Sequence, residues 1–240
     1  MKFKDLTIMI FDERVVGIEK LTYKDFPGKL ACVLFYAGCN AHCPYCYDTD
    51  VVKCKLSYMD SRDVQKFLLD RKGKLDGVVF CGGECTLHQE DLLCDLRWCK
   101  DNGFLTKIDT NGSNPSLVDY AVKNGLVDYI SIDYKAPESK INSFYSKHLY
   151  KLFLETLMNL IQQNTINFEV RTTVHRDVIN EDDLSQMSQT LVGLGYTKPY
   201  YIQQFFEGED VKYLDETLDR HPEKLDLRKV DSHGLTLVER

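Results

Sequence analysis

Three cysteines, Cys39, Cys43 and Cys46, stand close together in the spacing C-x3-C-x2-C. Thiolates are soft ligands that suit zinc or an iron–sulfur cluster, and a short loop brings three of them to one site while ordering little of the chain. A closed structural zinc site or a cubane cluster normally takes four protein ligands. Three cysteines therefore predict a metal centre with one position open to a substrate.

These cysteines also allow other interpretations. A zinc knuckle would use the same spacing, with His42 as the candidate fourth ligand, and three buried thiols would bind no metal. We favour the open metal centre because the motifs downstream would otherwise be coincidental, and we expect His42 to face outward. Cys81 and Cys85 leave a second metal site open as an alternative. The remaining cysteines are interpreted as structural: Cys32, Cys54, Cys94 and Cys99.

Polar residues that could bind a ligand follow several apolar runs further along the chain. Gly82, Gly83 and Glu84 form a turn whose paired glycines let the backbone approach a ligand closely, and such a turn can hydrogen-bond an amino group. The other polar candidates are Asp109, Asn111, Asp133, Lys135, Arg171 and Gln203. Taken singly, most have a plainer explanation, such as a turn, a helix cap or a solvated charge. Arg171 differs because a charge inside a buried strand is costly unless paired, so it points into a site or meets a carboxylate.

Six short apolar runs are the strands predicted to position these residues, at 30–37, 77–80, 105–109, 129–133, 167–174 and 200–205. They alternate with amphipathic stretches, which is the pattern of a parallel sheet built from β–α units. Six units are too few to close an eight-stranded barrel. In β/α barrels the chemistry lies where the strands end at their C-terminal rim, so motifs that follow strands favour functional interpretations.

Four stretches between these strands carry apolar residues at helical spacing. The apolar faces are Val64, Phe67 and Leu68; Leu92, Leu96 and Cys99; Leu149, Leu152, Phe153, Leu157, Leu160 and Ile161; and Leu184, Met187, Leu191 and Leu194. Asp60, Asn114 and Asn180 are predicted helix caps, and Pro115 follows Asn114 at the first helical position.

The two ends of the chain are predicted to extend this core. Residues 6–11 and 15–18, with a turn at 12–14, predict an N-terminal hairpin. Residues 207–229 mix acidic and basic side chains and predict a solvated segment that is helical in part, and 235–238 predict a final strand. The predicted division is a hairpin extension at 1–20, a core domain at 21–206 and a C-terminal extension at 207–240.

Length and composition fit one α/β domain, since 240 residues with 43% hydrophobic content can bury a sizeable core. A formal charge of −7 argues against a general nucleic-acid binder, which would carry a basic face. No signal-peptide pattern opens the chain, and no run approaches the ~18 apolar residues of a membrane span. We therefore expect a cytoplasmic protein that binds neither nucleic acid nor membrane. Nine cysteines, an odd count without a secretion signal, indicate reduced thiols and metal ligands rather than disulfides.

The cysteine motif, with aromatic Tyr45 before its last cysteine, resembles the signature of the radical S-adenosylmethionine (SAM) superfamily. Residues 23–31 (YKDFPGKLA) and 107–115 (KIDTNGSNP) resemble the activating proteins of anaerobic ribonucleoside-triphosphate reductase, which are glycyl radical enzyme activases. The resemblance runs from about residue 21 to 205. It implies an α/β fold with a partial, open (β/α)6 barrel of the radical SAM type, whose open side suits a large partner.

The resemblance also implies a cofactor for each part of the site. Cys39, Cys43 and Cys46 would hold three irons of a [4Fe–4S] cluster, and the fourth iron would take the amino and carboxylate groups of SAM. The turn of Gly82, Gly83 and Glu84 matches the G-G-E-P motif that binds the methionyl amino group, although Cys85 replaces the usual proline. The remaining SAM contacts that the resemblance implies are Tyr45, Asn111, Asp109, Asp133, Lys135, Arg171 and Gln203. Among them, Lys135 would meet the methionyl carboxylate, and the two aspartates could share a monovalent cation.

The implied reaction is the reductive cleavage of SAM at the cluster, followed by removal of a hydrogen atom from a glycine of the reductase. The cofactors supply this chemistry, so no acid–base catalytic residue is expected. An electron donor such as flavodoxin or ferredoxin would be needed, and only one cluster is expected because no second C-x2-C set follows. The alternatives are an activase of another glycyl radical enzyme of the pyruvate formate-lyase type, a small-molecule radical SAM enzyme, a zinc-bound interaction module and an iron–sulfur electron carrier.

Overall fold

One twisted sheet forms the frame of the structure, a computed structural model that describes residues 14–163, 165–205 and 213–240. Within these residues its eight strands follow chain order, and all pairs but the first are parallel. The strands are β1 (Val15–Thr22), β2 (Ala31–Tyr36), β3 (Gly77–Gly82), β4 (Leu105–Thr110), β5 (Tyr129–Asp133), β6 (Asn167–Val174), β7 (Tyr200–Gln204) and β8 (Leu237–Glu239). The described sheet does not close, because β1 and β8 are its two edges.

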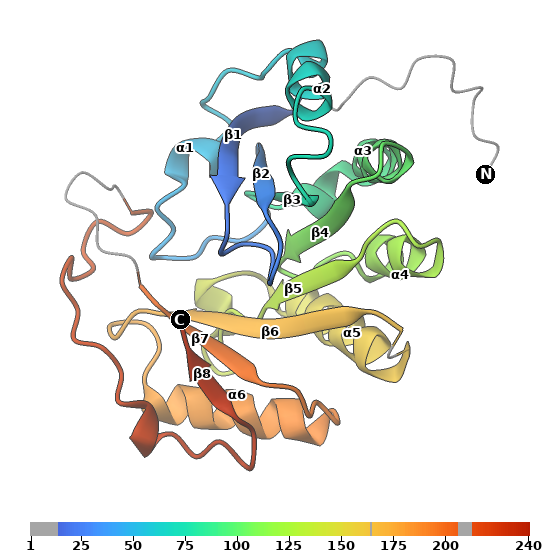
Figure 1. The fold of residues 1–240 in the computed structure, drawn as a ribbon. Coiled ribbons are helices and arrows are strands. Elements are labelled where there is room, and N and C mark those ends of the chain that lie inside the picture. The colour runs from blue at the N-terminus through green and yellow to red at the C-terminus, as the bar shows by residue number, and fades with distance from the viewer. Residues whose placement is uncertain (1–13, 164, 206–212) are drawn as a thin grey trace.

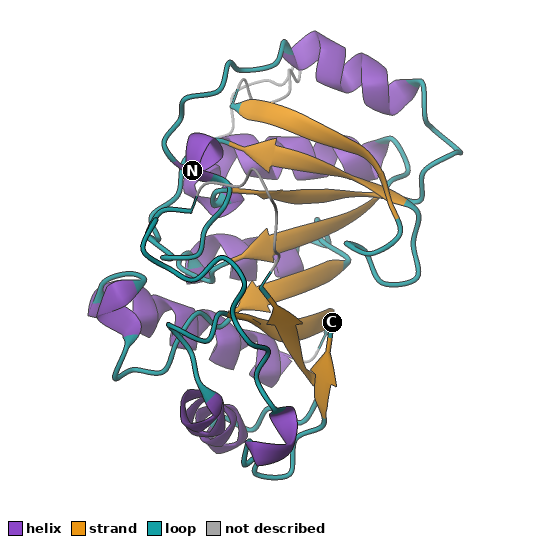
Figure 2. Ribbon diagram, turned by 90° about the vertical axis from the view of Figure 1, so that its left-hand side faces the viewer, coloured by secondary structure: helices purple, strands orange, loops and turns teal. Residues whose placement is uncertain are grey.

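Helices cover the outer face of this curved sheet (Figure 1). The described helices are α1 (Thr49–Val52), α2 (Ser61–Leu69), α3 (Gln89–Asp101), α4 (Pro115–Lys123), α5 (Lys147–Gln163) and α6 (Glu181–Gly193). Each parallel strand from β2 to β6 is followed by one helix of the series α2 to α6 before the chain enters the next strand. Figure 2, turned by 90°, shows the strands fanning out on one side of the helices. None of the helices in these ranges is long and apolar enough to cross a membrane.

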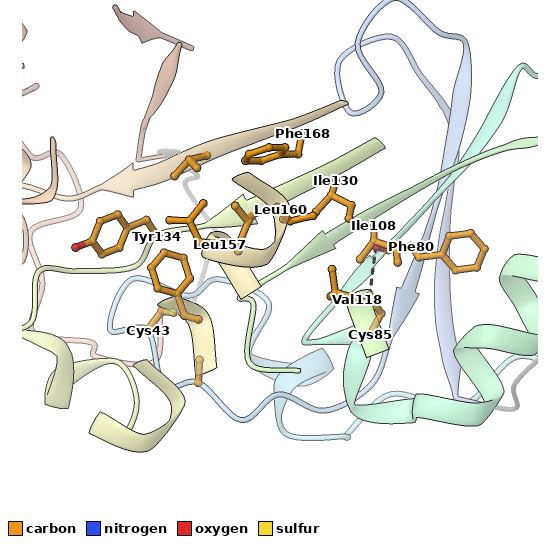
Figure 3. Packing of buried hydrophobic residues seen from close by; sticks show 14 of the residues in the cluster. Cys43, Phe80, Cys85, Ile108, Val118, Ile130, Tyr134, Leu157, Leu160 and Phe168 are labelled. Atoms are coloured by element: carbon orange, nitrogen blue, oxygen red, sulfur yellow. Dashed lines mark hydrogen bonds between the residues drawn. The ribbon is translucent and has the colours of Figure 1, made fainter. Parts of the chain in front are cut away.

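The main hydrophobic core lies between the sheet and these helices. Side chains alternate along a strand, so Cys32, Leu34 and Tyr36 of β2 face the helices while Val33 faces the inside of the barrel. Figure 3 shows this outer core, in which the Cys85 thiol donates a hydrogen bond to the Phe80 carbonyl oxygen. Strands β2 (ACVLFY) and β3 (GVVFCG) appear in the sequence as almost continuous apolar runs, as expected where both sheet faces are covered, whereas β4, β6 and β7 also carry polar residues.

A second, smaller apolar cluster lies on the inner side of the sheet. Phe26, from the sequence motif YKDFPGKLA at 23–31, packs there with Val33 and Val79 and is 3% exposed. A Cβ added at Gly77 would lie 2.9 Å from the Phe26 ring, so the first residue of β3 must be small. The motif before the cysteines therefore contributes Phe26 to the apolar packing inside the barrel.

The sequence predictions agree with most of this arrangement. All six predicted strands are present within two residues of the predicted bounds, and the predicted final strand is β8, parallel to β7. Asp60, Asn114 and Asn180 cap α2, α4 and α6 as predicted. These features were predictable because strand runs and caps are local signals.

Three expectations differ from the structure. The predicted second strand of the hairpin, 15–18, is part of β1, which continues to Thr22 and pairs with β2, whereas 6–11 lies outside the described residues. The sixth unit has no α-helix in its described part, where only a 3₁₀ turn at Leu227–Lys229 precedes β8. The segment 207–229 is not wholly solvated, because Tyr213 and Leu225 are buried against the core.

Helix α6 shows how strongly a local signal fixes one element. The Asn180 side chain accepts a hydrogen bond from the Asp183 amide, and the Asp183 carboxylate accepts one from the Asn180 amide. We expect Asn180→Ala to lower the free energy of unfolding by about 1 kcal/mol, because one backbone amide loses its acceptor. Urea denaturation of the cluster-free protein measures this. Asn180→Ser, which keeps an acceptor, is the control, and an equal loss in both variants would contradict the explanation.

Candidate active site

A cavity of about 430 Å³ opens at the C-terminal ends of the parallel strands. It receives side chains from the loop after β2 and from the ends of β3 to β7. All thirteen residues predicted from the sequence line it: Cys39, Cys43, Tyr45, Cys46, Gly82, Gly83, Glu84, Asp109, Asn111, Asp133, Lys135, Arg171 and Gln203. Residues spread over more than 160 positions of sequence thus meet in one place, as the C-terminal rim of a β/α barrel allows.

The cysteine loop is held by backbone hydrogen bonds from several parts of the chain. The Glu84 amide donates to the Gly38 carbonyl at 2.8 Å, and the amide of His42, whose side chain is exposed as expected, donates to Phe144. The Leu214 amide of the C-terminal extension donates to the Cys46 carbonyl at 3.2 Å. The loop is therefore fixed from both sides, and the C-terminal extension forms part of its support.

The three thiols of this loop are buried enough to be protonated when no metal is bound. Burial raises the pKa of Cys39 to about 12 and that of Cys46 to about 11, and it also raises the pKa of Cys43. Because only thiolates bind metal, cluster loading releases their protons. No three His, Cys, Asp or Glu side chains among the described residues surround a single metal-ion position. In a cubane cluster each cysteine binds a different iron, so its ligands need not converge on one point.

The glycine turn after β3 lies directly against the cysteine loop. A Cβ added at Gly83 would lie 2.0 Å from the Gly38 carbonyl oxygen and 3.2 Å from the Cys39 Cβ. Gly82 adopts φ +112, and a Cβ there would lie 2.2 Å from the Tyr36 amide nitrogen. Both positions therefore require glycine, one for close approach and the other also for its backbone angle.

Glu84 ties this turn to the loop after β4. Its carboxylate accepts hydrogen bonds from the Thr86 and Thr110 hydroxyls at 2.6 and 2.7 Å and from the Thr86 and Asn111 amides at 3.1 and 2.7 Å. Burial nevertheless raises the pKa of Glu84 above its ordinary value. The Asn111 side chain in turn donates to Asn40 in the cysteine loop at 2.8 Å. Glu84 and Asn111, both predicted SAM contacts, thus connect the loops that follow β2, β3 and β4.

Charged side chains form a further part of the cavity lining. Arg171 Nη2 lies 3.0 Å from Asp109 Oδ2, and Arg171 Nε donates a hydrogen bond to Asp133 Oδ1 at 2.5 Å. Lys135 Nζ lies 2.9 Å from Asp133 Oδ2. Burial by itself would raise the pKa of Asp133, but the charges of Arg171 and Lys135 outweigh it and hold the pKa well below its usual range. Arg171, for which the sequence allowed two interpretations, therefore lines the site and is also paired.

The sequence prediction gave no role in the SAM site to four further residues, Cys54, Cys81, Cys85 and Lys107. Cys81 lines the cavity, and burial raises the pKa of its thiol to about 12, whereas Cys85 is buried in the outer core. Lys107 pairs with Asp109 from inside the barrel. The signal that places Lys107 there is alternation, because residues two apart on β4 share a face. Cys54 was predicted to be structural, yet it is exposed in the turn after α1 with φ +53.

The residues present fit an iron–sulfur cluster and SAM. Three soft thiols supply three ligands, and the cavity volume lies within the usual range for a small-molecule site. The buried hydroxyl of Tyr45 has no hydrogen-bond partner in the described part of the chain, so a ligand in the cavity would satisfy it. The cations of the cavity lining, Lys135 and Arg171, match a ligand that carries a carboxylate.

Comparison with known proteins identifies the class to which this site belongs. The profile of the Radical SAM superfamily matches residues 33–191, and the chain belongs to this superfamily, whose members use a [4Fe–4S] cluster and SAM. A putative glycyl-radical enzyme activating enzyme of Methanocaldococcus jannaschii is 32% identical over 197 residues, covering 80% of this chain and 79% of that protein. The pyruvate formate-lyase-activating enzyme of Clostridium pasteurianum is 32% identical over 127 residues, covering 51% and 52%. The chain is thus a homologue of glycyl radical enzyme activases.

Relatives of another kind also match. The 7-carboxy-7-deazaguanine synthase of Clostridium acetobutylicum is 27% identical over 201 residues, covering 80% of this chain and 84% of that protein. QueE from Escherichia coli superposes with a TM-score of 0.52 at 15% identity, covering 94% and 92% of the two chains. A structure of anSMEcpe with bound AdoMet and a peptide gives a TM-score of 0.57 at 14% identity, covering 74% and 52%. At these identities the two structures show the shared fold alone.

Proposed function

We propose that this protein activates anaerobic ribonucleoside-triphosphate reductase by generating a glycyl radical on it. The observation that supports this best is that one cavity gathers the cysteine triad and all ten further residues that the activase resemblance implies. The relative from Methanocaldococcus jannaschii, named as a putative glycyl-radical enzyme activating enzyme, matches over four fifths of the chain. The proposed location is the cytoplasm, with a flavodoxin or ferredoxin as the electron donor.

Each part of the cavity has a role in this proposal. Cys39, Cys43 and Cys46 hold the cluster, and the turn at Gly82–Glu84 and the Lys135 ammonium orient the amino and carboxylate groups of SAM. The remaining proposed SAM contacts are Tyr45, Asn111, Asp109, Asp133, Arg171 and Gln203. When bound, the cluster and SAM supply the electron and the carbon-centred radical that removes hydrogen from a glycine Cα. The protein contributes position and exclusion of water, and no side chain acts as a general base.

The test uses the anaerobically reconstituted protein with SAM, a strong reductant and the anaerobic ribonucleotide reductase of the same organism. We expect a glycyl doublet in the electron paramagnetic resonance spectrum, together with 5′-deoxyadenosine. Pyruvate formate-lyase from the same organism, added in place of the reductase, is the matched comparison. Formation of 5′-deoxyadenosine with a doublet only on pyruvate formate-lyase would move the proposal to that partner.

A small-molecule reaction is the second candidate, and the synthase relative favours it because it matches over 80% of this chain. In that case 5′-deoxyadenosine would form without any glycyl doublet. Expression of this chain would also restore 7-carboxy-7-deazaguanine in cells that lack their own synthase. Failure of that complementation, together with the doublet, would exclude the second candidate.

A further inference from the structure

Five charged side chains inside the barrel form a continuous chain of ion pairs in the order Lys107, Asp109, Arg171, Asp133 and Lys135. Lys107 Nζ pairs with Asp109 Oδ1, and Arg171 Nη2 lies 3.0 Å from Asp109 Oδ2. Arg171 Nε lies 2.5 Å from Asp133 Oδ1, and Lys135 Nζ lies 2.9 Å from Asp133 Oδ2. Each of the four carboxylate oxygens therefore already has a cationic partner from the protein.

The charge of this chain of ion pairs is unfavourable for a further cation. Two carboxylates stand beside two ammonium groups and one guanidinium, which gives a formal charge of +1 before any ligand binds. A potassium or sodium ion takes hard oxygen ligands and would have to share these oxygens with the protein cations or displace one of them. Sharing brings like charges together, and a displaced cation would lie unpaired in a largely buried site, so both are costly.

Lys107 is the member of this chain of ion pairs that does not line the cavity. Its side chain is 1% exposed, and its position two residues before Asp109 on β4 places it on the same inner face. Its ammonium group also lies 5.9 Å from the centroid of the Tyr129 ring. Lys107 can therefore neutralise the charge of Asp109 without lining the cavity, which stays free for SAM.

We propose that Lys107 and Arg171 are built-in counter-ions of Asp109 and Asp133, and that SAM consequently binds here without a free monovalent cation. Lys107 is a positioning residue, because it acts on the ligand site through Asp109. This assignment replaces the shared cation that the sequence resemblance implied. It rests on the binding of SAM and not on the identity of the partner protein.

The test measures the dissociation constant of SAM for the cluster-loaded protein, by calorimetry, in choline, potassium or sodium chloride at equal ionic strength. For the wild-type protein we expect the three constants to agree within about twofold. In Lys107→Met one carboxylate oxygen is released, so we expect SAM to bind about tenfold more weakly in choline and to recover in potassium or sodium. A wild-type protein that needs potassium or sodium to bind SAM would overturn the proposal.

Two controls separate this role from a general loss of structure. Lys100→Met removes the pair between Lys100 and Asp128, which are 2.7 Å apart and outside the cavity, and should leave SAM binding independent of the cation. Lys107→Arg keeps the positive charge, so relative to Lys107→Met it should rescue SAM binding in choline. If Lys107→Met does not fold, a direct measurement of thallium(I) binding to the wild-type protein tests the proposal instead. One thallium ion per chain that potassium displaces would overturn the proposal, as would cation-independent SAM binding by a folded Lys107→Met.

Because the experiment measures SAM binding, its outcome does not depend on which partner protein receives the glycyl radical. A reductase that receives no glycyl radical would refute the proposed partner and leave the counter-ion assignment intact. Conversely, a cation-dependent wild-type site would refute the counter-ion assignment while a glycyl doublet still formed.

Discussion

Cys43→Ser is expected to abolish both cluster assembly and the cleavage of SAM. A serine hydroxyl is a hard ligand that stays protonated at neutral pH, so one iron would lose its thiolate. Cys43 is 8% exposed, which leaves little room for another ligand to take its place. Iron and sulfide content, the visible absorbance of the reconstituted protein and the yield of 5′-deoxyadenosine measure the effect. We expect all three to fall to background.

The matched control is Cys94→Ser on α3, because Cys94 is half-buried on the outer side of the molecule and does not line the cavity. It should assemble a normal cluster and cleave SAM at the wild-type rate. Undiminished formation of 5′-deoxyadenosine by Cys43→Ser would refute the assignment of the triad. A colourless wild-type protein that binds one zinc ion would favour the interaction module instead.

The cysteine triad and the strands could be predicted because their signals are local in sequence. The spacing C-x3-C-x2-C can be read directly from the sequence, and the apolar runs of β2 to β7 are bounded by turn residues. The barrel rule then placed the motifs after those strands at one rim, and the cavity confirms that they meet. The resemblance supplied the radical SAM superfamily, which the profile match confirms, whereas the narrower family of reductase activases and the partner stay predictions.

The pairing of charges inside the barrel could not be predicted in the same way. The sequence left Arg171 either in the site or paired with a carboxylate, and the structure shows that both hold. Which carboxylates it meets depends on the register between β4, β5 and β6, which no local pattern states. Lys107 was missed although alternation along β4 places it on the same face as Asp109, because a lysine two residues from an aspartate in sequence is usually solvated.

The prediction of a solvated, partly helical segment at 207–229 was wrong in its described part, because the residues that pack there are sparse. Between 213 and 229 the mixed charges dominate the composition, and only Tyr213 and Leu225 among its apolar residues are buried. Periodicity finds regular elements and cannot find an irregular segment fixed by single anchors. The amides of Leu214 and Asp215 nevertheless bind carbonyls of the cysteine loop at 3.2 and 3.0 Å. This contact makes the extension part of the site's support.

The glycine turn gives the second large effect, because it sets the distance between two loops of the site. We expect Gly83→Ala to reduce cluster content and SAM binding by at least about tenfold while the fold persists. An added Cβ would lie 2.0 Å from the Gly38 carbonyl oxygen and 2.6 Å from the Gly38 carbonyl carbon, both backbone atoms that no rotamer change can move. The cysteine loop must therefore shift, and with it the direction of the Cys39 thiol. Iron content and SAM binding by calorimetry measure the loss, and circular dichroism verifies the fold.

Gly193→Ala is the matched control for this prediction. Gly193 ends α6, and a Cβ there would meet nothing within 4 Å. That variant should keep its cluster and its affinity for SAM, since alanine is the better helix former. If Gly83→Ala also kept them, the cysteine loop would have to tolerate displacement by the width of a methyl group. The cluster site would then be set by the cysteines alone, and the contact with the turn after β3 would have no part in positioning it.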